Sequence, residues 1–218
     1  CSDDLELAAA VTAPGVPEIG TDAGAAIGKT TGILISDDVQ EIAKADVLID
    51  FTRPQATLTY LPFCVAHNVG VVIGTTGFDA QGKEKIAAAA KSVPVVFAPN
   101  MSVGVNSVLK LLEIAGAMLS QYDCEIVEMH HKHKVDAPSG TALEMGRRVA
   151  QGRGVDFDSV AVLSREGHTG ERPDGAIGFA ALRGGDVVGD HTVIFAGPGE
   201  RIEISHKSGS RAGYAQGA

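Results

Sequence analysis

Cysteine is scarce in this sequence of 218 residues. The three cysteines, Cys1, Cys64 and Cys124, are scattered along the chain and form no C-x-x-C pair, which excludes a disulfide framework. We expect ordinary buried thiols in a reducing compartment, and therefore predict a cytoplasmic protein.

Long apolar runs and extended basic segments are also missing. No run approaches the roughly 20 apolar residues that a membrane-spanning helix needs, so we predict that the chain is not a membrane protein. The formal net charge is -9, and basic residues gather in one short stretch only. Nucleic acids and anionic membranes require an extended basic face, so neither is predicted as a partner. A small anion in a local pocket is still compatible with this composition.

A further absence is the G-x-G-x-x-G motif, which normally follows the first strand of a dinucleotide-binding fold. The sequence begins at Cys1, and its first apolar segment, 5–11, is typical of a strand. Two explanations stay open: the fold binds no dinucleotide, or the first strand and its loop precede Cys1. We expect an internal fragment, whose targeting peptide, if it has one, lies outside the sequence.

Short apolar runs alternate with helix-like segments through the first hundred residues, which predicts a parallel sheet with crossover helices. Ser36, Thr52 and Asp79 precede the helical segments and are predicted N-caps, with Pro54 in the first turn of the second helix. The continuous apolar character of 71–73 and 95–97 indicates strands buried on both faces. The strands are expected at 5–11, 31–35, 46–51, 69–73 and 93–98.

The second half has a different organisation, so we place a domain boundary near residue 101. A long helix is expected at 103–119 and a shorter one at 141–151. The remaining apolar segments follow one another with short turns between them, which indicates an antiparallel or mixed sheet. These strands are expected at 122–130, 160–164, 176–183, 187–195 and 200–206.

One stretch, 128–142 ("EMHHKHKVDAPSGTA"), concentrates positive potential in this acidic chain. Thr141 and Glu144 fit a capping box, so a helix is expected to begin there with free amides at Ser139 and Gly140. The basic cluster and the helix N-terminus together predict a pocket for a carboxylate or phosphate. The cluster consists of His130, His131, Lys132, His133 and Lys134.

Other interpretations of this stretch are a solvated basic loop before an ordinary capped helix, and a metal site. His131 and His133 with Asp136 have the donor types of a metal site, but the interleaved lysines would repel a cation, so no metal is predicted. Two more stretches, 71–78 ("VVIGTTGF") and 97–106 ("FAPNMSVGVN"), end strands of the predicted parallel sheet. Ligands bind at such strand ends, although a plain turn or a hinge explains them equally well.

Six motifs occur along the chain in the order in which they occur in one enzyme family. The motifs are "DFTRP" (50–54), "GTTGF" (74–78), "APNMSVGVN" (98–106), "HHKHKVDAPSGTA" (130–142), "SREGHTGER" (164–172) and "GFAALRGGDVVGDHTVIF" (178–195). Together they closely resemble 4-hydroxy-tetrahydrodipicolinate reductase (dihydrodipicolinate reductase), and the resemblance runs almost end to end. Two departures are the absent N-terminal glycine-rich loop and the absent segment that would follow Ala218.

The resemblance implies an α/β protein with a Rossmann-like dinucleotide-binding domain, whose N-terminal strand and Gly-rich loop are missing. An α+β substrate and oligomerisation domain with a mixed, mainly antiparallel sheet would follow it. The implied ranges are 1–101, 102–211 and, as the start of a return to the first domain, 212–218. A homotetramer is implied, with strands within 176–206 at its interface.

The resemblance also implies a reaction. NADH or NADPH would deliver hydride to a cyclic dicarboxylate in diaminopimelate and lysine biosynthesis, giving tetrahydrodipicolinate. His130 matches the general acid and Lys134 the lysine that binds substrate and helps to protonate it. Charged Lys134 would lower the pKa of His130 and bound carboxylates would raise it, and the sequence leaves the balance open.

The remaining implied site residues fall into two groups. The substrate carboxylates would be held by His131, Ser139, Gly140, Thr141 and Arg211. The cofactor would be held by Arg53, Gly74, Thr75, Thr76, Ala98, Pro99, Asn100 and Met101. Two alternatives stay open: a non-catalytic dicarboxylate-sensing NAD-domain protein, and a related amino-acid dehydrogenase.

Overall fold

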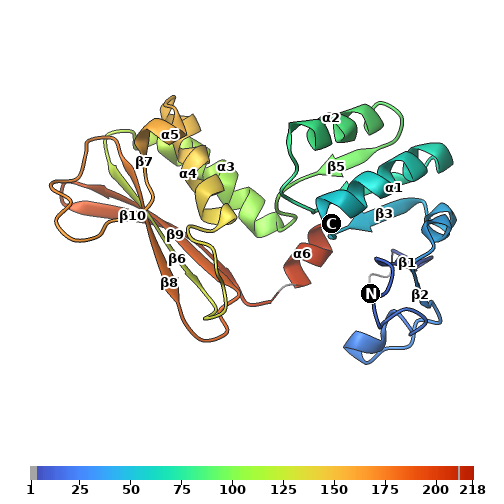
Figure 1. Cartoon of the computed structure of the whole chain (residues 1–218). Helices are drawn as coiled ribbons and strands as arrows, with labels where there is room; N and C mark the ends of the chain where they lie inside the picture. The colour runs from blue at the N-terminus through green and yellow to red at the C-terminus, as the bar shows by residue number, and fades with distance from the viewer. Residues whose placement is uncertain (1–3, 211) are drawn as a thin grey trace. The chain divides into compact units, whose positions relative to one another are not determined.

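The chain has two separate hydrophobic cores, one in each of two compact units. Figure 1 shows the helices and strands of both units. The computed structural model describes residues 4–210 and 212–218. One compact unit comprises the chain up to Pro99 together with Ala218, and the other comprises Asn100–Gly217. Within the described residues, no helix has both the length and the apolar character that crossing a membrane requires.

The first unit contains the predicted parallel sheet. Its strands lie in the order β3-β4-β5 and are joined by helices, because parallel strands need a crossover connection. The central strand is buried along its whole length, as its continuous apolar sequence predicts. The elements are β3 (Val47–Asp50), α1 (Pro54–His67), β4 (Gly70–Ile73), α2 (Ala80–Ala89) and β5 (Val95–Phe97).

The strand predicted at 5–11 is largely wrong. Only β1 (Ala10–Val11) is a strand, paired in parallel with the equally short β2 (Ile35–Ser36), and Leu5 is 71% exposed. An apolar sequence forms a strand only where another strand pairs with it, and within the described residues 5–9 have no such partner. The connection between β1 and β2 is instead an irregular loop with a 3-10 turn, η1 (Ala25–Ile27), ordered around the carboxylate of Asp22.

Of the three predicted N-caps in this unit, only Asp79 is confirmed, since its carboxylate accepts from the Gly82 amide. Ser36 is wrong: it ends β2, and Asp38 caps the 3-10 helix η2 (Val39–Lys44). Thr52 is also wrong as a cap, because its hydroxyl donates to Asp50 and α1 begins after Arg53 without a side-chain cap.

The expectation that 95–97 is buried on both faces is not met. Val96 is 55% exposed and Phe97 40% exposed. The reason is position, because β5 is an edge strand of the three-stranded sheet. An apolar run alone does not distinguish a central strand from an edge strand.

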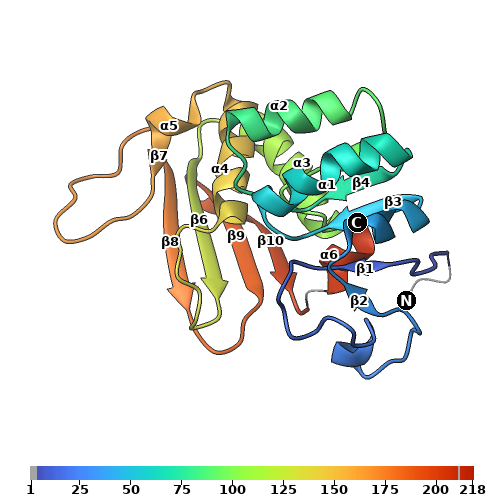
Figure 2. The same ribbon diagram turned by 45° about the vertical axis from the view of Figure 1, so that its right-hand side comes forward.

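The second unit has the predicted mixed sheet, in the order β10-β9-β6-β8-β7 (Figure 2). The β9 and β10 pairings are antiparallel and join more residues than the parallel pairings of β8 with β6 and β7. A short helix, α5, was not predicted. The elements are α3 (Val103–Met118), β6 (Asp123–His130), α4 (Gly140–Arg153), α5 (Phe157–Val160), β7 (Ala161–Val162), β8 (Ile177–Arg183), β9 (Gly189–Gly197), β10 (Glu200–Ser208) and α6 (Ala212–Gly217).

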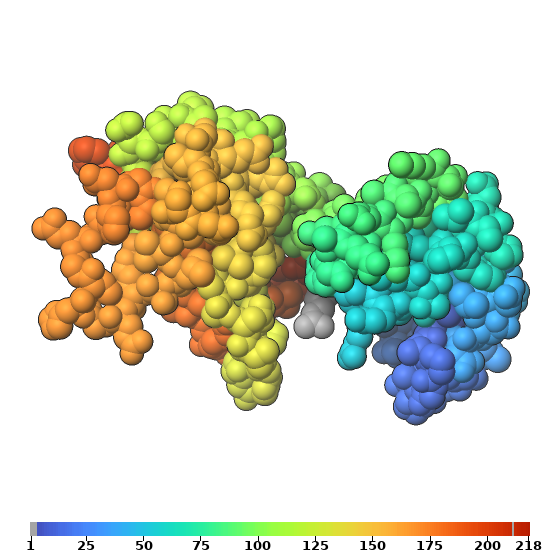
Figure 3. Space-filling model, turned by 45° about the horizontal axis from the view of Figure 1, so that its top comes forward, coloured from blue at the N-terminus to red at the C-terminus, as the bar shows by residue number. Residues whose placement is uncertain are grey.

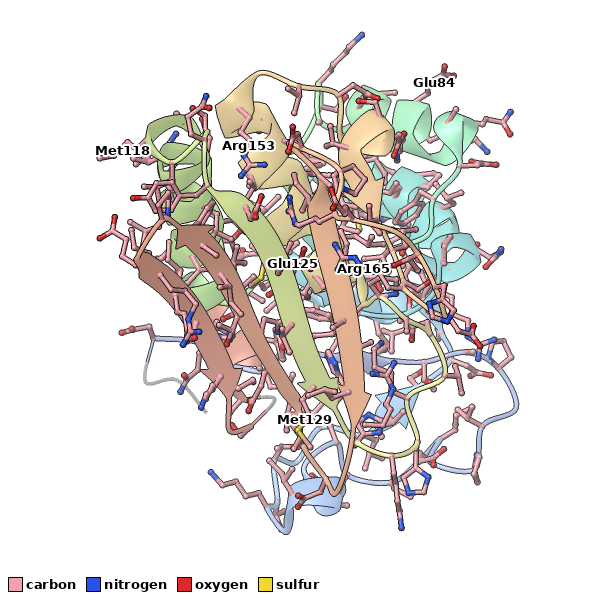
Figure 4. All side chains as sticks on the ribbon, turned by 90° about the vertical axis from the view of Figure 1, so that its left-hand side faces the viewer. Glu84, Met118, Glu125, Met129, Arg153 and Arg165 are labelled. Atoms are coloured by element: carbon pink, nitrogen blue, oxygen red, sulfur yellow. The ribbon has the colours of Figure 1, made fainter. Side chains whose placement is uncertain are left out.

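Helices α3 and α4 cover one face of this sheet and form the core with it. Alternate residues of β6, including Cys124 and Ile126, are buried against the helices, while Glu125 and Val127 lie on the other face. The sheet therefore keeps one face free of helices, which Figure 4 shows from that side. The long segment between β7 and β8 stands out from the second unit in Figure 3 (orange), and its Arg165 pairs with Glu125 at 2.8 Å.

Two glycines allow α3 and α4 to approach closely. A Cβ on Gly152 would lie 2.0 Å from the Glu113 carbonyl oxygen, and one on Gly116 would lie 2.6 Å from the Val149 carbonyl oxygen. Both neighbours are backbone atoms, which cannot move aside without shifting a helix. The contact therefore requires glycine on both helices.

Replacing Gly152 by alanine is expected to destabilise the second unit by about 1–3 kcal/mol, the usual range for overpacking. This loss outweighs the gain in helix propensity, which is at most about 1 kcal/mol. The measurement is denaturant unfolding. Gly213→Ala is the matched control, because no atom lies within 4 Å of a Cβ there and the residue is exposed in α6. Equal stability changes in the two variants would contradict the close-contact interpretation.

Candidate active site

His130 is the last residue of β6, at the end of the strand nearest the N-terminus of α4. Strand alternation places its side chain on the helix-covered face with Ile126 and Glu128, and it is 8% exposed. A Cβ on the neighbouring Gly189 would lie 3.1 Å from His130 Nε2, so glycine at that position leaves room beside this ring nitrogen.

Glu128 lies two residues earlier on the same face and is fully buried. Its Oε1 accepts from the Ser139 amide at 2.8 Å, while its Oε2 lies 3.4 Å from His130 Nδ1 and 3.5 Å from His191 Nε2. His191 comes from β9, directly opposite Glu128 in the strand register. The two imidazole rings meet edge to face at 5.1 Å.

Ser139, not Thr141, caps α4, so the predicted capping box is wrong. Ser139 has an extended backbone, and its hydroxyl accepts from the Ala142 amide at 3.1 Å and shares a 3.2 Å hydrogen bond with His191 Nε2. Thr141 already lies within the helix. The sequence S-G-T-A offers two hydroxyl caps two residues apart, and the buried partners Glu128 and His191 favour the first of them.

The basic cluster divides into side chains with different surroundings. Lys134 is 17% exposed, and its ammonium group lies 2.6 Å from Asp136, while Lys132 is exposed. Arg183, opposite His130 in the sheet, donates to the Lys134 carbonyl at 3.2 Å and to the Asp136 carbonyl at 2.5 Å, which fixes this turn. An open hollow beside the turn is lined by His131, Lys132, His133, Gly185 and Asp186.

Burial and neighbouring charges shift the pKa values at this site. Burial alone would raise the pKa of Glu128, but the His191 imidazole 3.5 Å away, the hydrogen bond from Ser139 and the charge of His130 lower it to about 2. Burial lowers the pKa of His130; Glu128 opposes this effect, and His191, Lys134 and Arg183 reinforce it. In the protein without ligand, the pKa of His130 therefore lies below its ordinary value.

The alternative metal site at His131, His133 and Asp136 is not assembled among the described residues. The two rings lie 6.3 Å apart, and Asp136 pairs with Lys134. Glu128, His130 and His191 form the one group of donor atoms within 4.8 Å of one another in the described chain. We assign no metal to this group, because Ser139 already binds both the carboxylate and His191.

The candidate cofactor residues of the first unit lie at the carboxyl ends of its parallel strands, where ligands bind in such sheets. Gly74 follows β4, and a Cβ there would lie 2.1 Å from the Phe51 ring, so the glycine allows this half-exposed ring to lie against the backbone. The Thr75 side chain is buried and points to Asp50, at 3.4 Å, whereas Thr76 is exposed. A glycine backbone beside an exposed aromatic ring fits a flat, planar ligand.

The other candidate residues are placed as follows. Arg53 is exposed at the start of α1, and Ala98 and Pro99 follow β5. Asn100 caps the turn before α3 through a 2.9 Å bond from the Ser102 amide, and Met101 is buried. Arg211 lies outside the described residues.

The sequence analysis did not select Glu128, His191, Arg183 or Phe51. Strand alternation from His130 would have placed Glu128 on the same face, so a signal for it existed. His191 and Arg183 required the strand order, because they reach the site from β9 and β8. Phe51 lies inside the quoted "DFTRP" motif, but its contact with Gly74 depends on the pairing of β3 with β4.

A parallel-sheet unit of the dinucleotide-binding type and a unit that holds a buried histidine beside a helix N-terminus fit the class of nicotinamide-dependent oxidoreductases. Family models match both halves of the chain: "Dihydrodipicolinate reductase, N-terminus" over residues 1–101 and "Dihydrodipicolinate reductase, C-terminus" over residues 104–218. The chain belongs to the dihydrodipicolinate reductase family.

Individual relatives of the chain support the same family assignment. The chain is 60% identical to the 4-hydroxy-tetrahydrodipicolinate reductase of Cupriavidus metallidurans, covering 100% of this chain and 83% of that protein. It is 57% identical to the enzyme of Bordetella parapertussis, covering 100% and 81%. A dipicolinate-bound dihydrodipicolinate reductase from Paenisporosarcina sp. TG-14 shares the fold, with a TM-score of 0.74 at 24% identity over 99% of this chain and 83% of that one.

Proposed function

We infer that this protein catalyses the NADH- or NADPH-dependent reduction of 4-hydroxy-tetrahydrodipicolinate to tetrahydrodipicolinate, a step of diaminopimelate and lysine biosynthesis. The observation that carries the inference is the family match over both halves of the chain at close to 60% identity to named reductases. The buried His130, with Lys134 in the following turn, adds the acid–base group that such a reduction needs.

Reduced nicotinamide supplies a hydride when bound, and the substrate becomes more electron-rich as the hydride arrives. A proton donor beside it offsets the developing charge, and His130 fits this role because imidazole titrates near neutrality. Lys134 binds substrate and supports the protonation, after leaving Asp136. His131 and the turn Ser139-Gly140-Thr141 hold the carboxylates; the Ser139 hydroxyl is engaged inside the protein, so it acts by shaping the turn. Arg211 completes this proposed set.

For the cofactor we propose the strand-end residues of the first unit and the segment that follows β5. Their support is the half-exposed ring of Phe51, which lies against Gly74 at the edge of the sheet where dinucleotides bind. The proposed set is Arg53, Gly74, Thr75, Thr76, Ala98, Pro99, Asn100 and Met101.

The function is tested by following reduced nicotinamide in the full-length protein while the dihydrodipicolinate synthase product is supplied. We expect oxidation of NADH or NADPH only when this substrate is present. Binding of the dicarboxylate by a folded preparation without any oxidation would instead favour the non-catalytic sensor. Oxidation dependent on an amino acid would favour a related dehydrogenase.

The protein is expected to discriminate only weakly between NADH and NADPH. In such folds an acidic residue after the second strand binds the adenosine ribose of NADH, or an arginine meets the 2′-phosphate of NADPH. Here β1 is followed by Thr12, whose amide donates to Ser36 at 2.9 Å, and by Ala13, so neither device is present at these positions. A missing carboxylate forfeits bonds worth roughly 1.5–3 kcal/mol but also removes repulsion of the phosphate.

These losses partly cancel, so kcat/KM for the two cofactors should agree within about tenfold, or roughly 1.4 kcal/mol. Steady-state kinetics with both cofactors decide the matter. A preference beyond about a hundredfold in either direction contradicts the argument, and a strong preference for NADPH would indicate a basic residue elsewhere in the full-length protein.

The helix-free face of the second sheet supports the proposed homotetramer. It carries an apolar centre between polar edges, and Leu182 there is 50% exposed. A second copy of the chain would cover this centre, and the mass in solution tests it by light scattering. The apolar residues are Val127, Met129, Ala180, Leu182 and Ile194.

The cellular setting and the domain ranges also remain proposals. Free, buried Cys64 and Cys124 fit a reducing cytoplasm. Two separate cores support a dinucleotide-binding domain at 1–101 and a substrate and oligomerisation domain at 102–211, with 212–218 starting the return. The proposed partner is a small dicarboxylate, with no nucleic acid and no membrane.

A further inference from the structure

The buried carboxylate of Glu128 has one oxygen without a hydrogen-bond partner, and that oxygen faces His130. Glu128 Oε2 and His130 Nδ1 are both buried and both unpartnered, yet they lie only 3.4 Å apart. Buried polar atoms are rarely left unpaired, because desolvation without a hydrogen bond costs free energy. A small reorientation of the His130 ring would join the two.

The carboxylate itself is firmly anchored, so the ring is the movable partner. Glu128 Oε1 accepts from the Ser139 amide at the N-terminus of α4, a helix of 14 residues whose dipole favours a negative charge there. His191 stands on the other side of Oε2 at 3.5 Å and is held by the Ser139 hydroxyl. Three elements, β6, β9 and α4, therefore fix the position of one negative charge beneath His130.

We propose that Glu128 is a positioning residue for the reduction: its carboxylate keeps the proton of neutral His130 on Nδ1, directs Nε2 to the substrate, and stabilises the protonated ring. This role rests on the proposed function for its catalytic meaning, but the geometry exists without substrate. Gly189, which leaves space beside Nε2, is consistent with a ligand reaching that nitrogen.

The proton transfer balances as follows. Protonated His130 carries N–H bonds on both nitrogens; as the hydride adds to the substrate, the Nε2–H bond breaks and its proton passes to the substrate. The Nδ1–H bond to Glu128 remains throughout, so His130 ends neutral in the tautomer that the carboxylate requires. A proton from water then restores the acid form.

Among the main charged neighbours of His130 in the described part of the chain, Glu128 is the one anionic group, so its removal should shift the protonation of His130 in one direction. The other neighbours are Lys134 from the turn, Arg183 from β8 and His191 from β9, and all three disfavour the protonated ring. Replacing Glu128 by glutamine leaves these effects unopposed. An opposite charge at this distance typically shifts a pKa by one to three units, so the acid form at neutral pH should fall about ten- to a hundredfold.

The first test needs no activity. Nitrogen NMR of histidine-labelled protein, assigned with His130→Gln, should show neutral His130 protonated on Nδ1 in the wild type. In Glu128→Gln the amide presents an N–H to this nitrogen, so we expect the tautomer to change to Nε2–H. A wild-type ring already protonated on Nε2 overturns the proposal, whatever the enzyme turns out to reduce.

The second test is the pH profile of the substrate-dependent reaction. Glu128→Gln should lower kcat about ten- to a hundredfold at neutral pH with little change in KM, and the rate should recover as the pH is lowered. Glu144→Gln, which removes a half-buried carboxylate that pairs with Arg148 on α4, is the matched control and should keep the wild-type profile. If kcat were lowered equally at every pH, so that the shape of the pH profile did not change, the role of Glu128 would be merely structural and the proposal would be overturned.

Glu128→Asp keeps the charge and is the fallback if the glutamine variant does not fold. Its shorter side chain cannot hold Ser139 and His130 together, so we expect an intermediate loss with the Nδ1–H tautomer retained. A failure of the wild type to oxidise cofactor would contradict the proposed function alone, since the NMR result is independent of it.

Discussion

Lys134→Ala is expected to lower kcat/KM by at least two to three orders of magnitude, the range typical of a lost acid–base or charge-stabilising group. The Lys134 side chain is 17% exposed, and its turn is held by two hydrogen bonds from Arg183. Its ammonium group is therefore confined near His130 before substrate arrives. A fixed charge in a partly dehydrated site acts more strongly on an anionic substrate than a charge in open solvent.

Lys132→Ala is the matched control, because it removes the same charge two residues away. Lys132 is exposed, and no side-chain contact to the buried network is found for it among the described residues. We expect less than a few-fold loss in steady-state kinetics. Equal losses in the two variants would mean that the cluster acts as diffuse positive charge, and the specific role of Lys134 would be withdrawn.

Structural features that depend on local sequence patterns were well predicted from the sequence. Burial of β4 and the helix α3 follow from continuous and 3.6-residue apolar patterns, and Asp79 caps its helix as expected. The predictions failed where a tertiary partner decides the structure. Residues 5–9 are mainly apolar, but no strand in the described part of the chain pairs with them. Helix α4 has Ser139 as its N-cap because Glu128 and His191 bind that residue.

In the candidate site, too, the sequence predicted the locally determined residues and missed those that depend on tertiary structure. His130 and Lys134 stand out in the sequence because they lie in one short basic stretch. The residues that set their chemistry are distant in sequence or have an ordinary appearance: Glu128 is one acid among many, and His191 faces it only through the β6–β9 register. Register is a property of the folded sheet, since a shift by one residue would move His191 to the helix-free face.

His130→Gln is expected to lower kcat by about two to four orders of magnitude, because glutamine offers an N–H but no transferable proton at neutral pH. In the wild type, kcat/KM should be highest at low pH, where His130 is protonated. Above the pKa of free His130, which burial places below its ordinary value, it should fall tenfold for each pH unit. The sign follows because the protonated form is the active one.

Bound carboxylates stabilise the protonated His130 ring. The pH above which kcat falls should therefore be higher than the pH above which kcat/KM falls. The residual activity of His130→Gln should no longer fall with rising pH in this way, which distinguishes loss of the proton donor from misfolding. Rate measurements across the histidine range, on variant and wild type in the same buffers, provide the comparison. A variant that keeps the wild-type pH dependence would assign the titration to another group, and His130 would no longer be the proton donor.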